Sequence, residues 1–425
     1  MSQAVQTRAR PRTATGMPMW PVTAPLLTYP IWWLSGLGEL ALVPFAVCAV
    51  VLLKRRPSVR IPRGLGAWLI MLVWVAASVV QLDTGGRLVG AGYRLVLYAA
   101  ITVLIVYIFN AWSPRNVQAM CGACAVFLLY MTLGALGGLM APLLELTTPL
   151  ALILPDGLLA NELVTEMAYR RLTNYDPTAY NAENMSPRPS APFLYTNGWG
   201  NSYSLILPLV LLYVSQTTDR RKAALVIVLI AVSTVPAALT LNRGMFLGLA
   251  VGALYFLVRA AANGRWGWLI GAAVVVGLGA VLVMVLPIQE RLEARDASSG
   301  STATRLMLYQ EAWERTLQSP VVGYGAPRPS IHLGAPSVGT QGQFWATLFS
   351  HGFFAAAALM TWLAVVVVVS LRRSDALHLA TGAVGIIAGV EILYYGFIPF
   401  GFLWVGIAAA LVFGAQQRGN PVTPA

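Results

Sequence analysis

The sequence is poor in charge, and this shortage excludes most soluble folds. Only 10% of the 425 residues are Asp, Glu, Lys or Arg, whereas 57% are hydrophobic. Soluble domains carry about 25% charged residues, so this composition is typical of a protein that crosses a lipid bilayer many times. We therefore expect the bilayer, and not a globular core surrounded by water, to organise the fold.

Lysine and cysteine are also scarce. Two of the 28 basic residues are lysines, and the three cysteines lie in apolar runs without the Cys and His partners of a zinc site. The sequence contains no glycine-rich phosphate loop and no dinucleotide fingerprint. We therefore expect no metal and no cofactor, and we assign the net charge of +12 to membrane topology and not to nucleic acid.

Apolar runs predict about twelve transmembrane helices in a single all-α polytopic membrane domain, 1–425. The candidate spans are 20–36, 38–53, 65–82, 93–110, 118–140, 200–216, 223–240, 244–258, 266–287, 343–370, 376–395 and 399–415. Gly36 and Gly38 are expected to form the turn between the first two. If that pair is instead one long helix, the topology changes.

The distribution of basic residues predicts the orientation. With both termini in the cytoplasm, 17 of the 28 Lys and Arg fall on the cytoplasmic side with two acidic residues, which satisfies the positive-inside rule. The tails 1–19 and 416–425 are then cytoplasmic. Two long polar segments, 141–199 and 288–342, become extracytoplasmic loops.

The second of these loops contains a predicted helix at 302–319. Leu306, Tyr309, Trp313 and Leu317 recur at helical spacing and line one face of it. We expect this helix to lie on the membrane or to pack over the bundle.

Arg243 is the only charged residue between Ala223 and Val258. An arginine near the middle of a membrane helix costs about 2.5–3.5 kcal/mol on insertion scales, so such a residue usually serves a site. The 15 residues from Gly244 to Val258 span roughly 22 Å, less than a hydrocarbon core of about 30 Å, which places Arg243 at the outer boundary. The alternative is an interfacial arginine whose side chain reaches back to water.

Arginines gather on the predicted outer side, where they are candidate ligands of an anionic substrate. A guanidinium group stays charged and holds phosphate oxygens with two hydrogen bonds. The candidates are Arg188, Arg243, Arg305 and Arg315, with Arg87 and Arg94 in the short loop between the third and fourth spans. The alternative, favoured for Arg170, Arg171, Arg291 and Arg295, is that outer arginines pair with outer acidic residues.

Candidate proton acceptors are few. His332 lies in the second outer loop, His351 early in the tenth span and Glu391 in the outer third of the eleventh. A hydroxyl that reacts usually needs such a base within hydrogen-bond reach. We expect His351 to be a hydrogen-bonded structural residue, whereas Glu391 is a candidate base or arginine partner because an unpaired carboxylate there would be costly.

Four segments follow one another along the predicted outer side: 188–197 (RPSAPFLYTN), 242–244 (NRG), 305–325, which contains SPVVGYG, and 339–352 (GTQGQFWATLFSHG). In this order they resemble the motifs of the O-antigen ligase and O-antigen polymerase superfamily of bacterial membrane glycosyltransferases. The last motif has a histidine where this chain has Gln341. Glutamine cannot act as a general base, so either His332 or a carboxylate does so, or the acceptor is positioned without strong base assistance.

The resemblance implies a GT-C-type fold and transfer of a glycan from undecaprenyl diphosphate to an acceptor sugar hydroxyl, with inversion and without a metal. The implied location is the outer face of the bacterial plasma membrane. The implied diphosphate ligands are Arg188, Arg243, Arg305 and Arg315, and the catalytic candidates are His332, Gln341 and Glu391. The implied partners are the lipid-linked donor, a glycan or glycolipid acceptor and the bilayer.

Two other classes stay open as alternatives. A transporter or flippase of lipid-linked glycans is expected to place polar residues at mid-membrane in broken helices and repeated halves, whereas the charges here collect at the outer edge. A non-catalytic scaffold of a glycan-assembly complex is consistent with the missing histidine.

Overall fold

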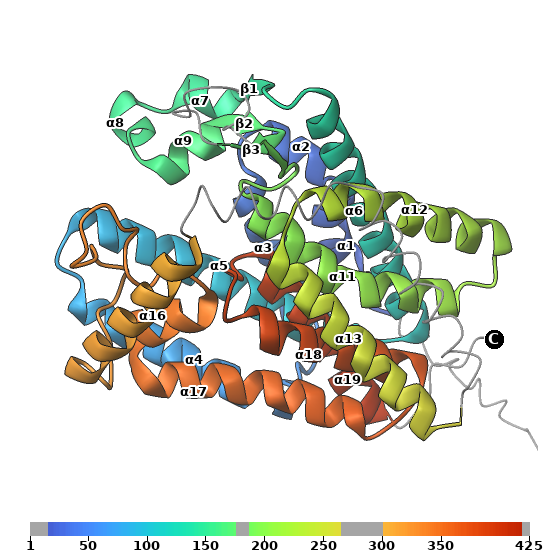
Figure 1. Cartoon of the computed structure of the whole chain (residues 1–425). Helices are drawn as coiled ribbons and strands as arrows, with labels where there is room; N and C mark the ends of the chain where they lie inside the picture. The colour runs from blue at the N-terminus through green and yellow to red at the C-terminus, as the bar shows by residue number, and fades with distance from the viewer. Residues whose placement is uncertain (1–15, 176–186, 265–300, 419–425) are drawn as a thin grey trace, which may run out of the picture.

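Helices form most of the described structure (Figure 1). The computed structural model describes residues 16–175, 187–264 and 301–418, with side chains from 303 onward in the last range. The helices are α1 (Trp20–Leu27), α2 (Tyr29–Leu34), α3 (Leu42–Lys54), α4 (Gly66–Ala77), α5 (Gly85–Asn110), α6 (Pro114–Met140), α7 (Pro149–Ile153), α8 (Asp156–Leu159), α9 (Glu162–Ala168), α11 (Thr196–Gln216), α12 (Arg220–Leu239), α13 (Arg243–Ala262), α16 (Ser301–Gln318), α17 (Gln343–Leu371), α18 (Ala376–Glu391) and α19 (Phe400–Arg418). Three short 3-10 helices are η1 (Gly38–Leu40), η2 (Arg63–Leu65) and η3 (Ser78–Gln81).

Two small antiparallel sheets lie outside the helix bundle. β1 (Glu145–Thr147) pairs with β2 (Tyr169–Arg171), and β3 (Thr173–Asn174) pairs with β4 (Arg188–Pro189). Together with α7, α8 and α9, they form a cap at the top of Figure 1. This cap falls within the predicted outer loop 141–199.

Seven helical segments of the described residues are long and apolar enough to cross a membrane. They are Arg63–Gln81, Gly85–Asn110, Pro114–Met140, Arg220–Leu239, Arg243–Ala262, Gln343–Leu371 and Phe400–Arg418. The chain is therefore an all-α polytopic membrane protein, as its composition predicts.

The other five predicted spans are shorter, more polar or not described. In the first pair, α1 and α2 are separated at Thr28, and α3 begins only at Leu42, after a turn in which Gly36 has a φ of 89°. α11 contains several buried polar side chains, and α18 has only 16 residues. The span predicted at 266–287 lies outside the described residues. The number of twelve spans therefore stays a prediction.

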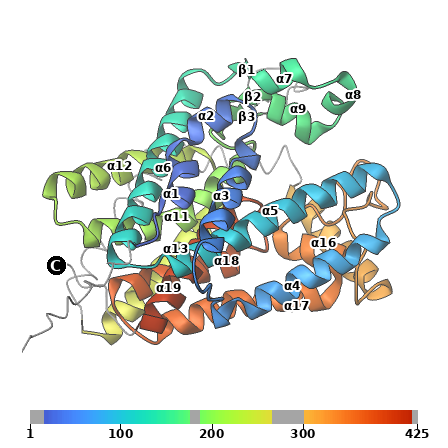
Figure 2. The ribbon, with the colours of Figure 1, turned by 180° about the vertical axis from the view of Figure 1, so that it is seen from behind.

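α19 lies at the centre of the bundle, where nearly all of its residues are buried. It packs against α5, α11 and α18. Phe402 on α19 lies within ring-contact distance of Trp68 on α4 and Tyr98 on α5, with ring centres 5.1 and 5.7 Å away. Figure 2 shows α4 and α5 on the near face when the molecule is seen from behind.

The helix predicted at 302–319 is confirmed as α16, and only part of its apolar stripe contacts the bundle. Leu306, Trp313 and Leu317 are 59%, 47% and 57% exposed, whereas Leu308 is buried. α16 packs on α17, where the Tyr309 ring stacks on Trp345 and the Trp313 ring meets Phe353, with ring centres 4.5 and 5.2 Å apart. The stripe therefore contacts α17 through its two aromatic residues, whereas Leu306 and Leu317 stay largely exposed.

Candidate functional site

The turn between α18 and α19, residues 392–399, joins the starts of other elements. The main-chain N–H of Gln343, the first residue of α17, donates to the carbonyl of Tyr395 at 2.8 Å. The hydroxyl of Tyr309 on α16 donates to the carbonyl of Leu393 at 3.2 Å. This turn therefore satisfies a free N–H at the start of α17 and ties α16 to the bundle.

α13 begins at the same turn. The N–H of Met245 donates to the Tyr395 hydroxyl at 2.8 Å, and a β-carbon on Gly244 would approach the Tyr395 ring to 2.8 Å. The Asn242 amide donates to the carbonyl of the first residue of α11 at 2.7 Å. These contacts fix the N-terminus of α13 and leave Arg243 exposed at it, where the helix dipole also favours an anion.

Arg188 lies at the same end of the bundle as Arg243. It is part of β4, opposite Asn174 of β3, and its carbonyl accepts a hydrogen bond from Thr196 Oγ1 at 3.3 Å. Thr196 is the residue that Asn242 contacts. Two of the predicted arginine motifs therefore converge at the start of α11.

Arg315 holds the second loop against α17. Its Nη1 lies 2.9 Å from Glu311 Oε1 and donates to the carbonyl of Pro329 at 3.0 Å. The guanidinium carbon lies 5.3 Å from the ring centre of Tyr324 and 5.1 Å from that of Phe349. This geometry favours the alternative in which Arg315 pairs with an acidic residue, since its Nη1 already has two acceptors.

Glu311 is held in its charged form. Burial would raise its pKa, but hydrogen bonds from Ser330 Oγ, Arg315 and the N–H of Ile331 outweigh this effect and lower the pKa. Arg305, which precedes Glu311 on α16, is half-buried and forms no ion pair with the acidic residues that the structure describes. Of these two arginines of α16, Arg305 is thus the better candidate ligand.

Of the four outer arginines expected to pair with acids, Arg170 and Arg171 do so, and Arg291 and Arg295 lie outside the described residues. Arg170 lies 2.7 Å from Glu39, and the two side chains are only 1% and 8% exposed. The Arg170 guanidinium also donates to the carbonyl of Trp33 at 3.2 Å. Arg171 lies 2.8 Å from Glu145 in a more exposed pair.

A kink in α17 admits the loop 320–325. Gly352 interrupts the helix with a φ of 80°, and a β-carbon there would lie 2.5 Å from the carbonyl oxygen of Val321. Two N–H groups of the loop donate to carbonyls of α17 at 3.0 and 2.7 Å. The loop therefore supplies the hydrogen bonds that the interrupted helix lacks.

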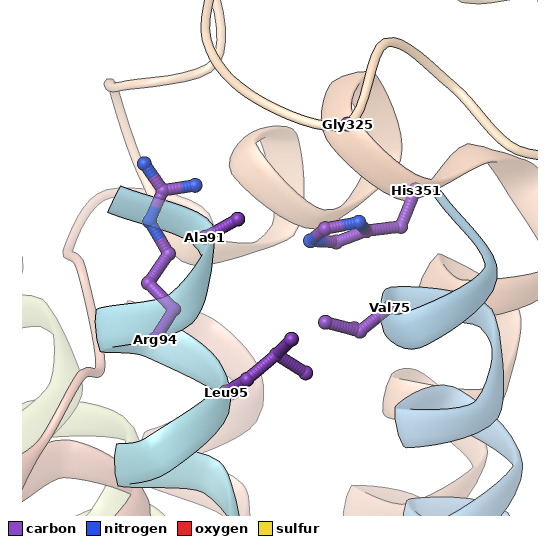
Figure 3. A pocket seen from close by; sticks show the side chains of 6 residues that line it. All are labelled: Val75, Ala91, Arg94, Leu95, Gly325 and His351. Carbon is purple, nitrogen blue, oxygen red and sulfur yellow. The ribbon is translucent and has the colours of Figure 1, made fainter. Parts of the chain in front are cut away.

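A cavity of about 240 Å³ lies between α5 and the start of α17. It is lined by Arg94, Tyr98, Pro327, Gly339, Thr340, Gln343, Ala346, His351 and Ile398. A second, smaller cavity shares Arg94 and His351 and adds Val75, Ala91, Leu95 and Gly325. Figure 3 shows Arg94 and His351 reaching from two different helices to this space.

Arg94 has the setting of an anion ligand. α5 begins at Gly85, so Arg87 and Arg94 lie on a helix and the prediction that both lie in a loop was wrong. The reason is that Thr84 caps this helix, whose first turns are more polar than a membrane span. Arg87 pairs with Asp83 at 2.6 Å, whereas Arg94 has no acidic partner in the described parts of the chain and lines the cavity.

The three predicted catalytic residues are not brought together. His332 is exposed at a loop tip, where its N–H donates to Ser330 at 3.1 Å. Glu391 is fully buried and accepts a hydrogen bond from Asn201 at 2.8 Å. Gln341 is half-buried between two residues that line the cavity. In the described ranges, no group of His, Cys, Asp or Glu is arranged to hold a metal ion.

Sequence reasoning missed Tyr395 and Gln343 and did not connect His351 with Ser78. Gln343 Nε2 donates to the Tyr98 hydroxyl at 3.3 Å, and its Oε1 accepts from an N–H of the turn 392–399. A polar residue at the head of an apolar helix would have indicated Gln343. No spacing indicates the 2.6 Å contact between Ser78 and His351, which lie 273 positions apart.

Comparison with known proteins supports the resemblance seen in the motif segments. Residues 225–360 match the family model described as O-Antigen ligase, and no curated protein matches the chain. The match covers about a third of the sequence and contains three of the four motif segments. It supports a role of the glycosyltransferase type in glycan assembly at a membrane. The chain is therefore a polytopic membrane protein, and the match of residues 225–360 supports its resemblance to the O-antigen ligase and O-antigen polymerase superfamily.

Proposed function

We propose that this protein transfers a glycan from undecaprenyl diphosphate to an acceptor sugar hydroxyl. The observation that carries this proposal is the meeting of the motif segments around the turn 392–399, beside a cavity lined by Arg94. Arg188 and Arg243 belong to segments that converge at the same end. A diphosphate is the group that several converging guanidinium groups bind best.

The reaction is a single displacement at the anomeric carbon. The acceptor oxygen forms a bond to this carbon while the bond from the carbon to the diphosphate oxygen breaks, and the electron pair leaves on the diphosphate. Attack opposite the leaving group inverts the anomeric centre, and the hydroxyl proton passes to a base. Arg94, Arg188 and Arg243 stabilise the charge that develops on the diphosphate, so no metal ion is required for that task.

The remaining candidate residues have supporting roles in this proposal. Arg305 is a further diphosphate ligand, whereas Arg315 keeps the loop on α17 through Glu311. Gln341 lies beside the cavity and suits a role in positioning the acceptor hydroxyl. The complete burial of Glu391 favours a structural role.

The site is proposed to face outward. The positive-inside rule places the tails 1–19 and 416–425 in the cytoplasm of a bacterium and the segments 141–199 and 288–342 outside the plasma membrane. The motif segments then share the outer side with a donor that has already been flipped across the bilayer.

The experiment supplies purified protein in lipid nanodiscs with a polyprenyl-diphosphate glycan and an acceptor glycan or glycolipid. We expect release of polyprenyl diphosphate that requires both substrates. A flippase, reconstituted in vesicles, would move the donor between leaflets without releasing this product, and a scaffold would do neither. Either result would contradict the proposal. Comparing a glycolipid acceptor with a copy of the donor glycan distinguishes ligation from polymerisation.

A further inference from the structure

His351 lies beside the kink of α17 and lines both cavities, and Figure 3 shows it in the smaller one. Its side chain is buried, and its Nδ1 lies 2.6 Å from Ser78 Oγ. From this geometry we propose that His351 is the general base of the chain, whose Nε2 accepts the proton of the acceptor hydroxyl. This role rests on the transfer reaction proposed above.

The hydrogen bonds of Ser78 determine which nitrogen of His351 is available. Ser78 Oγ lies 2.7 Å from the carbonyl of Val75, and a carbonyl only accepts, so the single hydroxyl proton lies in that bond. The short contact with His351 then requires the proton on Nδ1. A neutral imidazole has one N–H, so Nε2 keeps its lone pair. This nitrogen has no hydrogen-bond partner among the described residues.

The loop 320–325 packs against the backbone of both Ser78 and His351. A β-carbon on Gly323 would lie 2.6 Å from the N of His351, and one on Gly325 would lie 2.7 Å from the carbonyl oxygen of Ser78. The loop therefore touches the backbone of both residues at once. Its entry depends on the kink at Gly352, so the interrupted helix serves to orient the imidazole.

His351, the proposed base, and Arg94, a proposed diphosphate ligand, line the same cavity. Arg94 and Tyr98 are the titratable groups that line it with His351. Its volume of about 240 Å³ is below the roughly 300–1,000 Å³ of complete small-molecule sites, so it admits one end of a substrate. With the diphosphate near Arg94, an acceptor hydroxyl in the cavity gives its proton to Nε2 as its oxygen bonds to the anomeric carbon.

The other candidate bases have less suitable settings. His332 is exposed at the loop tip, where bulk water competes for any proton. Glu391 is enclosed by α11, α13 and α18, and a β-carbon on Gly248 would lie 2.1 Å from its Oε1. An acceptor sugar has no room beside this carboxylate.

The test compares His351→Ala with the wild-type protein in the release assay, with binding of polyprenyl diphosphate measured separately. We expect the rate of transfer to fall by about 10²–10⁴-fold, the range for loss of a general base, while binding is unchanged. His378→Ala is the matched control, because His378 is also buried but contacts Asp375 away from the cavity.

Ser78→Ala keeps the imidazole and removes only its orienting hydroxyl. We expect a smaller loss of rate, about tenfold, with binding retained. This variant keeps the test decisive if His351→Ala does not fold. A wild-type rate in the folded His351→Ala protein, or a loss of rate of this size in His332→Ala alone, would overturn the assignment. If the wild-type protein releases no polyprenyl diphosphate, the proposed function fails instead.

Discussion

The two ends of the helix bundle both contain many arginines, but they use them differently. At the end with most basic residues, Arg259 donates to the carbonyl of Leu371 at 3.0 Å and to Ser374 Oγ at 3.1 Å. Arg418 donates to the carbonyl of Asn110 at 3.5 Å. These arginines satisfy carbonyl groups at helix C-termini, where the helix dipole also favours a cation.

At the motif end, most arginines with described contacts pair with acids. Arg170, Arg171, Arg315 and Arg328 each contact a carboxylate, whereas Arg94 lines a cavity. The number of arginines therefore does not identify a ligand of the substrate. The groups that each guanidinium contacts distinguish three kinds of arginine: those that anchor helix ends, those in ion pairs and those that are candidate ligands.

The largest expected effect is a difference in transfer activity between substitutions at the two ends of the bundle. Arg94→Ala and Arg243→Ala should each lower the rate of polyprenyl diphosphate release by at least about 100-fold, because each removes a cation from the developing charge. Arg259→Ala, at the other end, should keep the wild-type rate. Equal losses in all three folded variants would show that position along the bundle does not matter.

Two neighbouring arginines of the motif end should differ in stability. Arg170→Ala leaves Glu39 buried without its partner and should lower the free energy of unfolding by about 3–5 kcal/mol. Arg171→Ala breaks a more exposed pair and should cost about 0–1 kcal/mol. Thermal unfolding of the variants in one detergent measures both. Similar losses for the two would contradict the role assigned to burial.

The kink in α17 offers a comparison between glycines. Gly352→Ala places a β-carbon against the loop 320–325 at a positive φ and should cost about 1–3 kcal/mol, with loss of activity as the loop moves. Gly389→Ala is the control, since a β-carbon there meets nothing within 4 Å. An unchanged melting temperature in Gly352→Ala would indicate that the kink is not required.

The smallest effect concerns the ion pairs of Asp83. Hydrogen bonds from Arg87 and Arg328 lower the pKa of Asp83, and Arg328 belongs to the loop before α17. Because the folded-state pKa is lowered, this contact stabilises the protein above the ordinary aspartate pKa of about 3.9 and is lost as the pH falls through the lower value. In the Asp83→Asn variant, the backbone amides of this loop should exchange their hydrogens faster than in the wild type at neutral pH. This difference in exchange rate should vanish at low pH. An equal difference at all pH values would contradict this.

Much of the fold could be predicted from the sequence because its elements are local. The apolar runs and the helix at 302–319 follow from composition and spacing, and the placement of Arg243 at a helix boundary follows from helix length. Arg87 and Arg94 were misplaced in a loop because a polar first turn does not reveal where a helix begins. The direction of the α16 stripe was not predictable, since spacing defines a face but not its neighbour.

The sequence by itself determined that this chain is a polytopic membrane protein and which segments resemble the O-antigen ligase motifs, because hydrophobicity and motif order are properties of the chain. Only the tertiary structure decided what each charged residue does. It paired Arg170 with Glu39, placed Arg94 and His351 beside one cavity and joined the starts of α13 and α17 through Tyr395. Such contacts join residues distant in sequence, and no local pattern specifies which of several similar side chains will meet.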